Sequence, residues 1–371
     1  MAAVETLMLR GGPRLQARMS RAEAHLEQAT TDVGAPLAGY VTAGGKRVRP
    51  LLVLLAAEAV PSDGEIAREL ALTRAAVAVE LMHSATLAHD DVLDGARLRR
   101  GQPTVVALAG PKAAIATGDL LFARAFAELA RNEDIVQLRA LSDAALALAV
   151  GELLQHEDMF AMRVSVERYL ERCELKTAAL FEVACRLGAR VVEGSPEGAV
   201  LQALDAFARN GVSAAVADGR AARINGGRPR AGAAAEGTLD ETAFGDVLGR
   251  FARRIGLAFQ LVDDVLDVGG PVADTGKRRG TDLLDGTVTL PLILAREADR
   301  ELAVLDLRTL KGPRQAEVVC DRIAATGALE EARDWALQIV RQAKAELPRE
   351  LPERLAGLLE LVADAVVERY R

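Results

Sequence analysis

Two clusters of aspartates have the spacing of a metal and phosphate site. Each cluster reads D-D-x-x-D, and together they comprise Asp90, Asp91, Asp94, Asp263, Asp264 and Asp267. In a helix, residues four apart lie on one face about 6 Å from each other, so the first and last aspartates of each cluster can share a divalent ion. Mg²⁺ takes one or two carboxylates and leaves other positions for water and phosphate. Two such clusters facing each other across a cavity would therefore bind a diphosphate.

The surroundings of the clusters favour this interpretation over a solvated surface. A single Asp-rich helix end is often plain surface, but here both clusters follow apolar runs, LMHSATLAH (81–89) and IGLAFQLV (255–262). Negative charges at the C-terminal end of a helix also oppose the helix dipole. The clusters would cost stability unless cations bind them, so the pair together predicts a cation site.

Basic residues that could bind an anion accompany the clusters. A glycine turn at 44–45 leads into three cations, and the candidate donors are Lys46, Arg47, Arg49, Arg97, Arg99, Arg100, Lys176, Lys277, Arg278 and Arg279. Arginine offers phosphate oxygens a planar fork and lysine a point charge. Each basic run alone is typical of a solvated surface. Combined with Mg²⁺, the set would neutralise a departing pyrophosphate.

Helices are predicted to position these residues. Apolar residues recur at helical spacing over residues 13–29, 48–60, 65–93, 113–131, 135–160, 166–191, 242–268, 290–297, 315–323, 329–345 and 351–371. Alanine and leucine dominate and β-branched runs are few, which favours helix over sheet. We expect an all-α helix bundle that forms a single domain over residues 1–371. The segment 214–239 has the composition of a flexible insert within it.

Composition excludes several classes of protein. A chain of 371 residues with 50% hydrophobic and 27% charged residues is neither collagen-like nor disordered. No segment has the roughly 18 uninterrupted apolar residues of a membrane span, and no secretory signal is evident, so a cytoplasmic location is expected. The net charge of −7 argues against binding of nucleic acid. The three scattered cysteines, Cys173, Cys185 and Cys320, argue against disulfides and a zinc site and are expected to be buried.

At this point a family resemblance is evident. The chain resembles the trans-isoprenyl diphosphate synthase (polyprenyl synthetase) family over roughly residues 40 to 295. The matching motifs, in order, are GGKRVRP (44–50), ELMHSATLAHDDVLD (80–94), RRGQPTV (99–105), GDLLFARAF (118–126), GELLQ (151–155), KTAALF (176–181), GLAFQLVDDVLD (256–267), GKRRGTDLLDG (276–286) and TLP (289–291). The resemblance implies an isoprenoid-synthase-type helix bundle with a deep central pocket, normally as a homodimer.

The resemblance also implies roles for individual residues. The catalytic set would be the six aspartates with Lys176 and Lys277. Isopentenyl diphosphate would be bound by Lys46, Arg49, His83 and Arg100. The allylic diphosphate would be bound by Arg99, Lys176, Thr177, Gln260 and Lys277. Of the aspartates, Asp90 and Asp94 would hold two Mg²⁺ ions and Asp263 a third, with Asp91, Asp264 and Asp267 as helpers.

The implied reaction is an electrostatically driven prenyl transfer. Mg²⁺ and the basic residues would stabilise the departing pyrophosphate, which leaves an allylic cation for the alkene of isopentenyl diphosphate to attack. A proton would then pass to the released pyrophosphate, so no side-chain nucleophile is required. One departure from the family pattern is Thr287, which stands where members commonly carry a second lysine.

Residues before the first cluster are expected to set the length of the product. Residues four and five positions before Asp90 lie about 6 to 7.5 Å deeper along the helix, and they are Thr86 and Ala85. In the family an aromatic residue there stops growth early, so the small Ala85 implies a longer chain, of about 30 to 50 carbons at roughly 4 to 5 Å per isoprene unit. The floor would then lie deeper, at Met82, Phe122 or Phe126, although each is equally typical of a core residue.

Three alternatives remain open. A shorter product, geranylgeranyl diphosphate, is the first. A terpene cyclase also uses D-D-x-x-D, but the low aromatic content of 3% and the separate GGKRVRP motif argue against one. A non-catalytic subunit of a heteromeric synthase is the third, although both acidic clusters here are complete. A long product would be lipid-like, so transient membrane contact at its release is a further expectation.

Overall fold

The computed structural model describes residues 2–31, 41, 45–58, 66–99, 101–193, 241–270, 279–349 and 351–368. The N-terminal elements are α1 (Ala2–Thr30), α3 (Val48–Ala56), α4 (Ile66–Leu93), β1 (Leu98–Arg99), β2 (Gln102–Pro103), α5 (Val105–Ala109), α6 (Pro111–Ala130), α7 (Ile135–Glu157), α8 (Val166–Cys173), the π-helical turn η2 (Glu174–Ala178) and α9 (Ala179–Glu193). The C-terminal elements are α12 (Glu241–Gly269), α14 (Thr281–Asp285), α15 (Leu290–Ala298), α16 (Arg300–Ala303), the 3₁₀ turn η3 (Leu307–Thr309), α17 (Pro313–Ala325), α18 (Ala328–Ala345) and α19 (Glu353–Val367).

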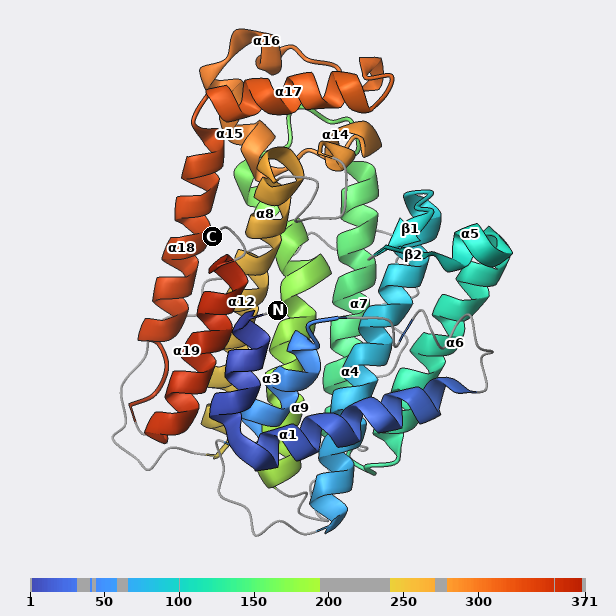
Figure 1. Cartoon of the computed structure of the whole chain (residues 1–371), viewed down its shortest axis with the longest axis vertical. Helices are drawn as coiled ribbons and strands as arrows, with labels where there is room; N and C mark the ends of the chain where they lie inside the picture. The colour runs from blue at the N-terminus through green and yellow to red at the C-terminus, as the bar shows by residue number, and fades with distance from the viewer. Residues whose placement is uncertain are drawn as a thin grey trace, which may run out of the picture.

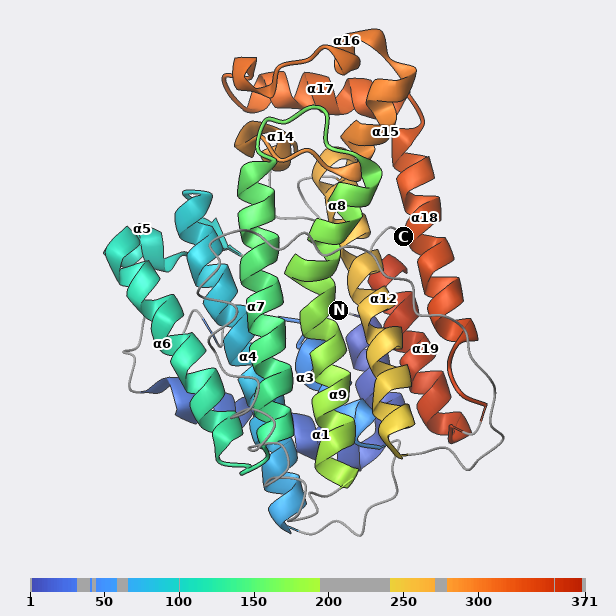
Figure 2. The same ribbon diagram turned by 180° about the vertical axis from the view of Figure 1, so that it is seen from behind.

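The long helices form a bundle. Helix α4 packs against α6, α9 packs against α3 and α12, and α12 packs against α18. Figure 1 shows α1 crossing the foot of this bundle and α17 crossing its top. Seen from behind, α7 and α9 stand between α4 on one side and α12 on the other (Figure 2). Helix α9 contacts both α4 and α12 and so joins the two helices that carry the acidic clusters.

The predicted all-α fold is confirmed. In the described part of the chain the strands are confined to one short hairpin, in which β1 pairs antiparallel with β2. The three cysteines are buried and free, as expected. The predicted insert 214–239 lies outside the described residues, so both the insert and the single-domain assignment stay predictions.

Two helices differ from the periodicity in an instructive way. The predicted helix 13–29 is preceded by a further helical segment from Ala2, and Gly12 joins the two with φ 72° and ψ −177°. The ring of Pro13 removes a helical hydrogen bond there, which produces the kink. The predicted continuous helix 166–191 is interrupted by the π-helical turn at 174–178. A π-helical turn adds one residue to an otherwise α-helical segment, and the hydrophobic periodicity of the whole segment does not show so short an interruption.

Glycines allow three helix contacts that bring the bundle together. A Cβ atom on Gly151 of α7 would lie 2.6 Å from the backbone nitrogen of Lys176 in the π-helical turn. A Cβ on Gly256 of α12 would lie 2.8 Å from Cα of Ala178 in the same turn. A Cβ on Gly188 of α9 would lie 2.0 Å from the carbonyl oxygen of Val53 in α3. The π-helical turn is thus clamped between α7 and α12 at backbone distance.

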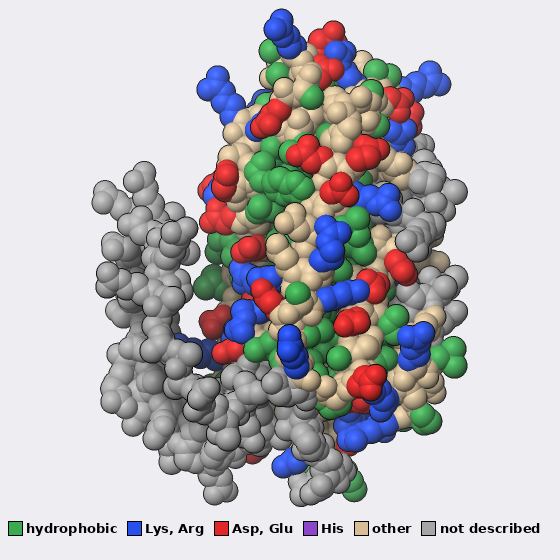
Figure 3. Space-filling model, turned by 90° about the vertical axis from the view of Figure 1, so that its left-hand side faces the viewer, with side chains coloured by type: hydrophobic (Ala, Val, Ile, Leu, Met, Phe, Trp, Pro, Cys, Tyr) green, Lys and Arg blue, Asp and Glu red, His purple; other side chains and the backbone are tan. Residues whose placement is uncertain are grey.

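The face of the molecule that carries α18 and α19 is charged but mixed in sign. Figure 3 views the side on which α18 and α19 lie, and basic and acidic side chains alternate over the described part of this face. Such interspersed charges keep a protein soluble without creating a strong field of one sign. Within the described residues, no helix combines the length and the apolarity needed to cross a membrane.

Gly188→Ala is expected to lower the free energy of unfolding by about 1 to 3 kcal/mol, because the added methyl group forces α9 away from α3. The matched control is Gly357→Ala on α19, where an added Cβ would have no heavy atom within 4 Å. That variant should gain about 0.5 to 1 kcal/mol from helix propensity. Urea unfolding followed by circular dichroism measures both. Equal effects of the two substitutions would show that the close approach is unimportant.

Candidate active site

A cavity of about 580 Å³ opens between α4, α6, α7, the π-helical turn and α12. Its lining combines acidic, basic and apolar groups. The lining residues are Arg49, His83, Thr86, Leu87, His89, Asp90, Leu93, Asp94, Arg99, Phe122, Leu148, Ala149, Glu152, Leu153, Lys176, Thr177, Phe259, Gln260 and Asp263. Eleven of the residues singled out from the sequence for site roles are therefore brought into one cavity.

The first acidic cluster lies at the C-terminal end of α4. The backbone N–H of Asp94 donates to the carbonyl oxygen of Asp90 at 2.8 Å, so the last helical turn carries both residues to the cavity as the four-residue spacing predicts. Asp91 is buried instead, and its Oδ1 accepts a hydrogen bond from Nε of Arg99 at 2.7 Å. Arg99 belongs to the β1–β2 hairpin, which is thereby tied to the end of α4.

The field in the cavity disfavours an additional negative charge. Desolvation is the main cause that raises the pKa of Asp90 to about 6, and the neighbouring carboxylates of Glu152 and Asp94 raise it further. Lys176 acts in the opposite direction and forms an ion pair with Glu152 at 2.5 Å. Desolvation lowers the pKa of Lys176, but Asp90 and Glu152 outweigh it, so its pKa is raised and the ammonium is retained. The cavity thus favours a bound cation.

The second acidic cluster distributes its aspartates among three environments. Asp263 lines the main cavity with Gln260. Asp264 faces an adjoining chamber of about 130 Å³, whose wall also contains Tyr169, Asp282 and Asp285. The chamber shares Asp94, Lys176, Thr177 and Gln260 with the main cavity, so the two are neighbours.

A chain of hydrogen bonds links Asp264 to the π-helical turn. Tyr169 donates its hydroxyl to Oδ2 of Asp264 at 2.6 Å, and the Gln260 amide donates to Oδ1 at 2.8 Å. Thr177 in turn donates to the Gln260 carbonyl oxygen at 2.6 Å. Desolvation, followed by the charge of Asp282, raises the pKa of Asp264 to about 7 despite these hydrogen bonds. Asp264 therefore acts as a buried anchor for Gln260 in this structure.

Asp267 caps the N-terminus of α14. Its two carboxylate oxygens accept hydrogen bonds from the backbone N–H groups of Thr281 and Asp282, each at 3.2 Å. These are the first residues of α14, where exposed N–H groups and the helix dipole favour a carboxylate. Asp267 thereby fastens α14 to the end of α12. The sequence spacing suggested an ion shared with Asp263, and the structure shows this cap.

The basic residues are only partly gathered in the cavity. Arg49 and His83 line it, whereas Lys46 is exposed and is not among the lining residues. The guanidinium of Arg49 lies over the ring of Phe181, 4.7 Å from its centroid, which fixes its direction. Arg100 and Lys277 lie outside the described residues, so their roles stay predictions.

The apolar end of the cavity lies along α4 and α6. Thr86 and Phe122 line it, whereas Ala85 and Met82 are fully buried and do not. Met82 precedes Thr86 by one helical turn and therefore lies on the same face of α4, below the lumen. Phe126 is half-buried and follows Phe122 by one turn on α6. The floor expected at Met82 or Phe126 is thus one turn deeper than the described lining.

The carboxylates of the cavity suit a hard divalent cation whose coordination is completed by a bound ligand. Within the described ranges, no group of three or more His, Cys, Asp or Glu side chains is close enough to hold a metal ion by itself. Asp90 and Asp94 come from α4 and Asp263 from α12, yet all three line the same cavity. Carboxylate oxygens are the ligands Mg²⁺ prefers, and it commonly uses one or two of them with substrate phosphate. The arrangement fits ions bridged by a diphosphate.

Two site residues escaped the sequence reasoning. Glu152 was quoted only as part of GELLQ, but it pairs with Lys176 inside the cavity. Tyr169 lies seven residues before Lys176, two helical turns along the chain, and this spacing was a possible signal. Its partner Asp264 is 95 residues away in sequence, so only the fold shows the contact.

Comparison with known proteins places the chain in a family. The polyprenyl synthetase family model matches residues 31–212 and 228–324. The chain is 31% identical to a geranylgeranyl diphosphate synthase of Methanosarcina mazei, over 89% of this chain and 87% of that protein. It is 32% identical to an all-trans-nonaprenyl-diphosphate synthase (geranyl-diphosphate specific) of Rhodobacter capsulatus, over 88% and 87%.

A solved structure agrees with these matches. The polyprenyl synthase of Caulobacter crescentus, complexed with calcium and isoprenyl diphosphate, superposes with a TM-score of 0.76 at 30% identity, covering 96% of this chain and 98% of that one. The all-α isoprenoid synthase fold and the match of the family model agree with the motifs that carried the resemblance. The chain belongs to the polyprenyl synthetase family and is a prenyltransferase.

Proposed function

We propose that the protein is a Mg²⁺-dependent synthase that condenses isopentenyl diphosphate with an allylic diphosphate into an all-trans polyprenyl diphosphate of about 30 to 50 carbons, at roughly 4 to 5 Å of extended chain per unit. The observation that carries the proposal is the division of the cavity. Carboxylates, Lys176 and Arg99 lie at one end, and Thr86, Phe122 and Leu148 line an apolar region that continues from them. The charged region would bind the diphosphate of an allylic substrate, and the apolar region would bind its hydrocarbon tail.

Two sets of polar residues in the cavity bind the two substrates in this proposal. Lys176, Thr177 and Gln260, held by the hydrogen bond between the last two, bind the allylic diphosphate together with Arg99 and Lys277. Arg49 and His83 bind isopentenyl diphosphate together with Lys46 and Arg100. The rigid π-helical turn keeps the donors of the allylic site in place, because oriented donors lose little entropy on binding.

Asp90, Asp94 and Asp263 would hold the Mg²⁺ ions, three per site by the family pattern. When bound, Mg²⁺ neutralises charge on the diphosphate and makes pyrophosphate a better leaving group. The Caulobacter crescentus relative, with its calcium and isoprenyl diphosphate, supports a divalent cation in a site of this family. The raised pKa of Asp90 is consistent with a position that a cation occupies during turnover.

The protein's own residues would direct the chemistry by position and charge. Lys176 and Arg99 stabilise the pyrophosphate as its bond to the allylic carbon breaks. The allylic cation then accepts the alkene electrons of isopentenyl diphosphate, and a new carbon–carbon bond forms. The departing proton passes to the released pyrophosphate. The apolar wall excludes water, which would otherwise capture the cation.

The alternatives are less well supported. Relatives include a geranylgeranyl diphosphate synthase, so the shorter product is the nearest alternative. A terpene cyclase requires several aromatic faces around a migrating cation. Among the described lining residues the phenylalanines are Phe122 and Phe259 alone, which is few for that purpose. A non-catalytic subunit has no need of Asp90, Asp94 and Asp263 in one cavity.

A homodimer formed through α6 and α7 completes the proposal. Leu146 and Val150 of α7 lie one helical turn apart and are 65% and 37% exposed, and Ile115 and Leu120 of α6 are exposed as well. An apolar stripe of this kind on a long helix is typical of a helix-to-helix interface. A cytoplasmic location and transient membrane contact at product release stay predictions.

The reaction is tested by incubating the purified protein with Mg²⁺, isopentenyl diphosphate and, separately, dimethylallyl, geranyl, farnesyl and geranylgeranyl diphosphates. We expect a ladder of products, identified by mass, that ends at about six to ten isoprene units. A ladder that stops at four units would support the geranylgeranyl alternative. Folded protein that elongates none of the primers, while cyclic hydrocarbons or nothing form, would contradict the proposal.

Binding of a hydrated Mn²⁺ or Mg²⁺ ion without substrate, with water in the positions that phosphate would take, should depend on pH through Asp90. The metal needs the carboxylate, so affinity should fall about tenfold for each pH unit below 6 and level off above about 7. Asp90→Asn should remove this dependence and lower kcat about 10²-fold or more. Asp143→Asn, at an exposed position on α7, is the control. Titration calorimetry at several pH values measures the affinity, and a pH-independent affinity in the wild type would refute the assignment.

Product length should respond to Thr86, which lines the lumen, more than to the fully buried Ala85. Thr86→Phe is expected to shorten the main product by at least two isoprene units, roughly 8 to 10 Å of chain. Met82→Ala is expected to lengthen it, because it opens space one turn deeper. The conservative Thr86→Ser should leave the ladder unchanged. If Thr86→Phe gives the wild-type ladder, the tail takes another path.

A further inference from the structure

Arg47 has an unusual backbone conformation between two cations of the proposed isopentenyl diphosphate site. Its φ and ψ are 46° and 35°, the left-handed region that a side chain with Cβ seldom adopts. Arg47 immediately precedes α3, so its backbone conformation sets the position of Lys46, just before the helix, relative to Arg49 in the first turn of the helix. A strained residue of this kind persists only where its surroundings hold it.

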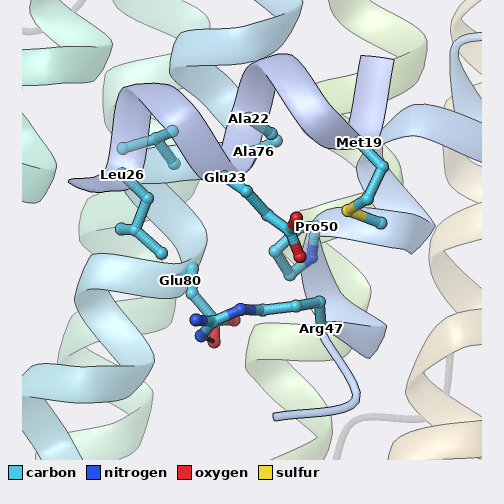
Figure 4. A pocket seen from close by; sticks show the side chains of 9 residues that line it. Met19, Ala22, Glu23, Leu26, Arg47, Pro50, Ala76 and Glu80 are labelled. Carbon is cyan, nitrogen blue, oxygen red and sulfur yellow. Dashed lines mark hydrogen bonds and ion pairs between the residues drawn. The ribbon is translucent and has the colours of Figure 1, made fainter. Parts of the chain in front are cut away.

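The side chain of Arg47 supplies that restraint. Nη1 donates to Oε1 of Glu80 at 2.5 Å, and Nη2 donates to the carbonyl oxygen of Val41 at 3.1 Å. The side chains of Arg47 and Glu80 are only 10% and 5% exposed. Figure 4 shows the pair under α1, with Met19, Leu26 and Pro50 around it. The cavity beside them measures about 10 Å³, so it has no room for a substrate.

Arg47 and Arg49 therefore serve different sides of α3. Arg49 lines the main cavity, whereas Arg47 is not among that cavity's lining residues and lines the small space between α1, α3 and α4. Glu80 belongs to α4 and precedes His83, which lines the main cavity, by one turn. The ion pair thus ties the turn that bears two cations to the helix that carries His83. The positions of Lys46, Arg49 and His83 relative to one another are thereby fixed.

We propose that Arg47, through its ion pair with Glu80, is a positioning residue for isopentenyl diphosphate. This inference rests on the proposed function, in which Lys46, Arg49 and His83 bind that substrate. Arg47 does not touch the substrate. It holds the left-handed turn so that the phosphate donors are oriented before binding, which lowers the entropy lost when the diphosphate binds.

The test uses Arg47→Gln, Glu80→Gln and Arg47→Lys in the full chain. Both glutamine variants should raise KM for isopentenyl diphosphate, and its dissociation constant in calorimetry without primer, by about tenfold, as expected when donors lose their orientation. KM for the allylic diphosphate should stay within about twofold, and Arg47→Lys should recover part of the loss. Arg18→Gln is the matched control, since Arg18 pairs with Glu69 of α4 at 2.5 Å and is 4% exposed, away from the turn.

The outcomes separate the possibilities. If Glu80→Gln tightens binding while Arg47→Gln weakens it, Arg47 contacts the substrate directly and the inference is wrong. The inference is also wrong if the Arg47 and Glu80 variants change KM for both substrates equally, lower the melting temperature and behave in these respects like Arg18→Gln. In that case the ion pair has a purely structural role. A folded wild-type protein that binds no isopentenyl diphosphate would overturn the proposed function, and the inference with it.

Discussion

The site depends on the desolvation of the carboxylates that line its cavity, because burial disfavours their charged forms and their mutual repulsion adds to this cost. Burial is the main cause that raises the pKa of Asp90 to about 6, and the carboxylates of Glu152 and Asp94 raise it further, although Lys176 is beside them. Four carboxylates line the cavity against the three cations Arg49, Arg99 and Lys176, and Arg99 already pairs with Asp91, so the cavity favours added cations. In the proposed function, a diphosphate with its metal ions would supply both the positive charge and the bridge between α4 and α12.

The bundle serves this constraint by holding charges at fixed distances. Gly151 and Gly256 allow α7 and α12 to approach the π-helical turn at backbone distance, so Lys176 and Thr177 are fixed between α7 and α12. Buried hydrogen bonds then orient the polar groups: Tyr169 and Asp264 hold Gln260 on one side. On the other side Glu80 holds Arg47, the residue between Lys46 and Arg49. Such preorganised donors stabilise a developing charge without reorganising during the reaction.

The sequence was sufficient for whatever depends on short-range spacing. Helical periodicity and composition predicted the all-α fold, and the four-residue spacing placed Asp90 and Asp94 in one cavity. It was insufficient where a long-range contact decides. Asp267 is used to cap α14, and Asp264 is engaged by a tyrosine 95 residues away in the chain, although the two aspartates share a motif with Asp263. Similarly, Thr86 and Ala85 are neighbours in sequence, and only the rotation of α4 in the bundle decides which one reaches the lumen.

The most direct test of the metal-bridged diphosphate is the position of the ions themselves. Crystals grown with Mn²⁺ and an allylic thiolodiphosphate, whose carbon–sulfur bond ionises slowly, would give anomalous diffraction from manganese. We predict peaks beside Asp90 and Asp94 and beside Asp263, joined by one diphosphate whose tail passes Thr86. Manganese confined to the chamber of Asp264, Asp282 and Asp285, or a diphosphate bound without metal, would contradict the central claim.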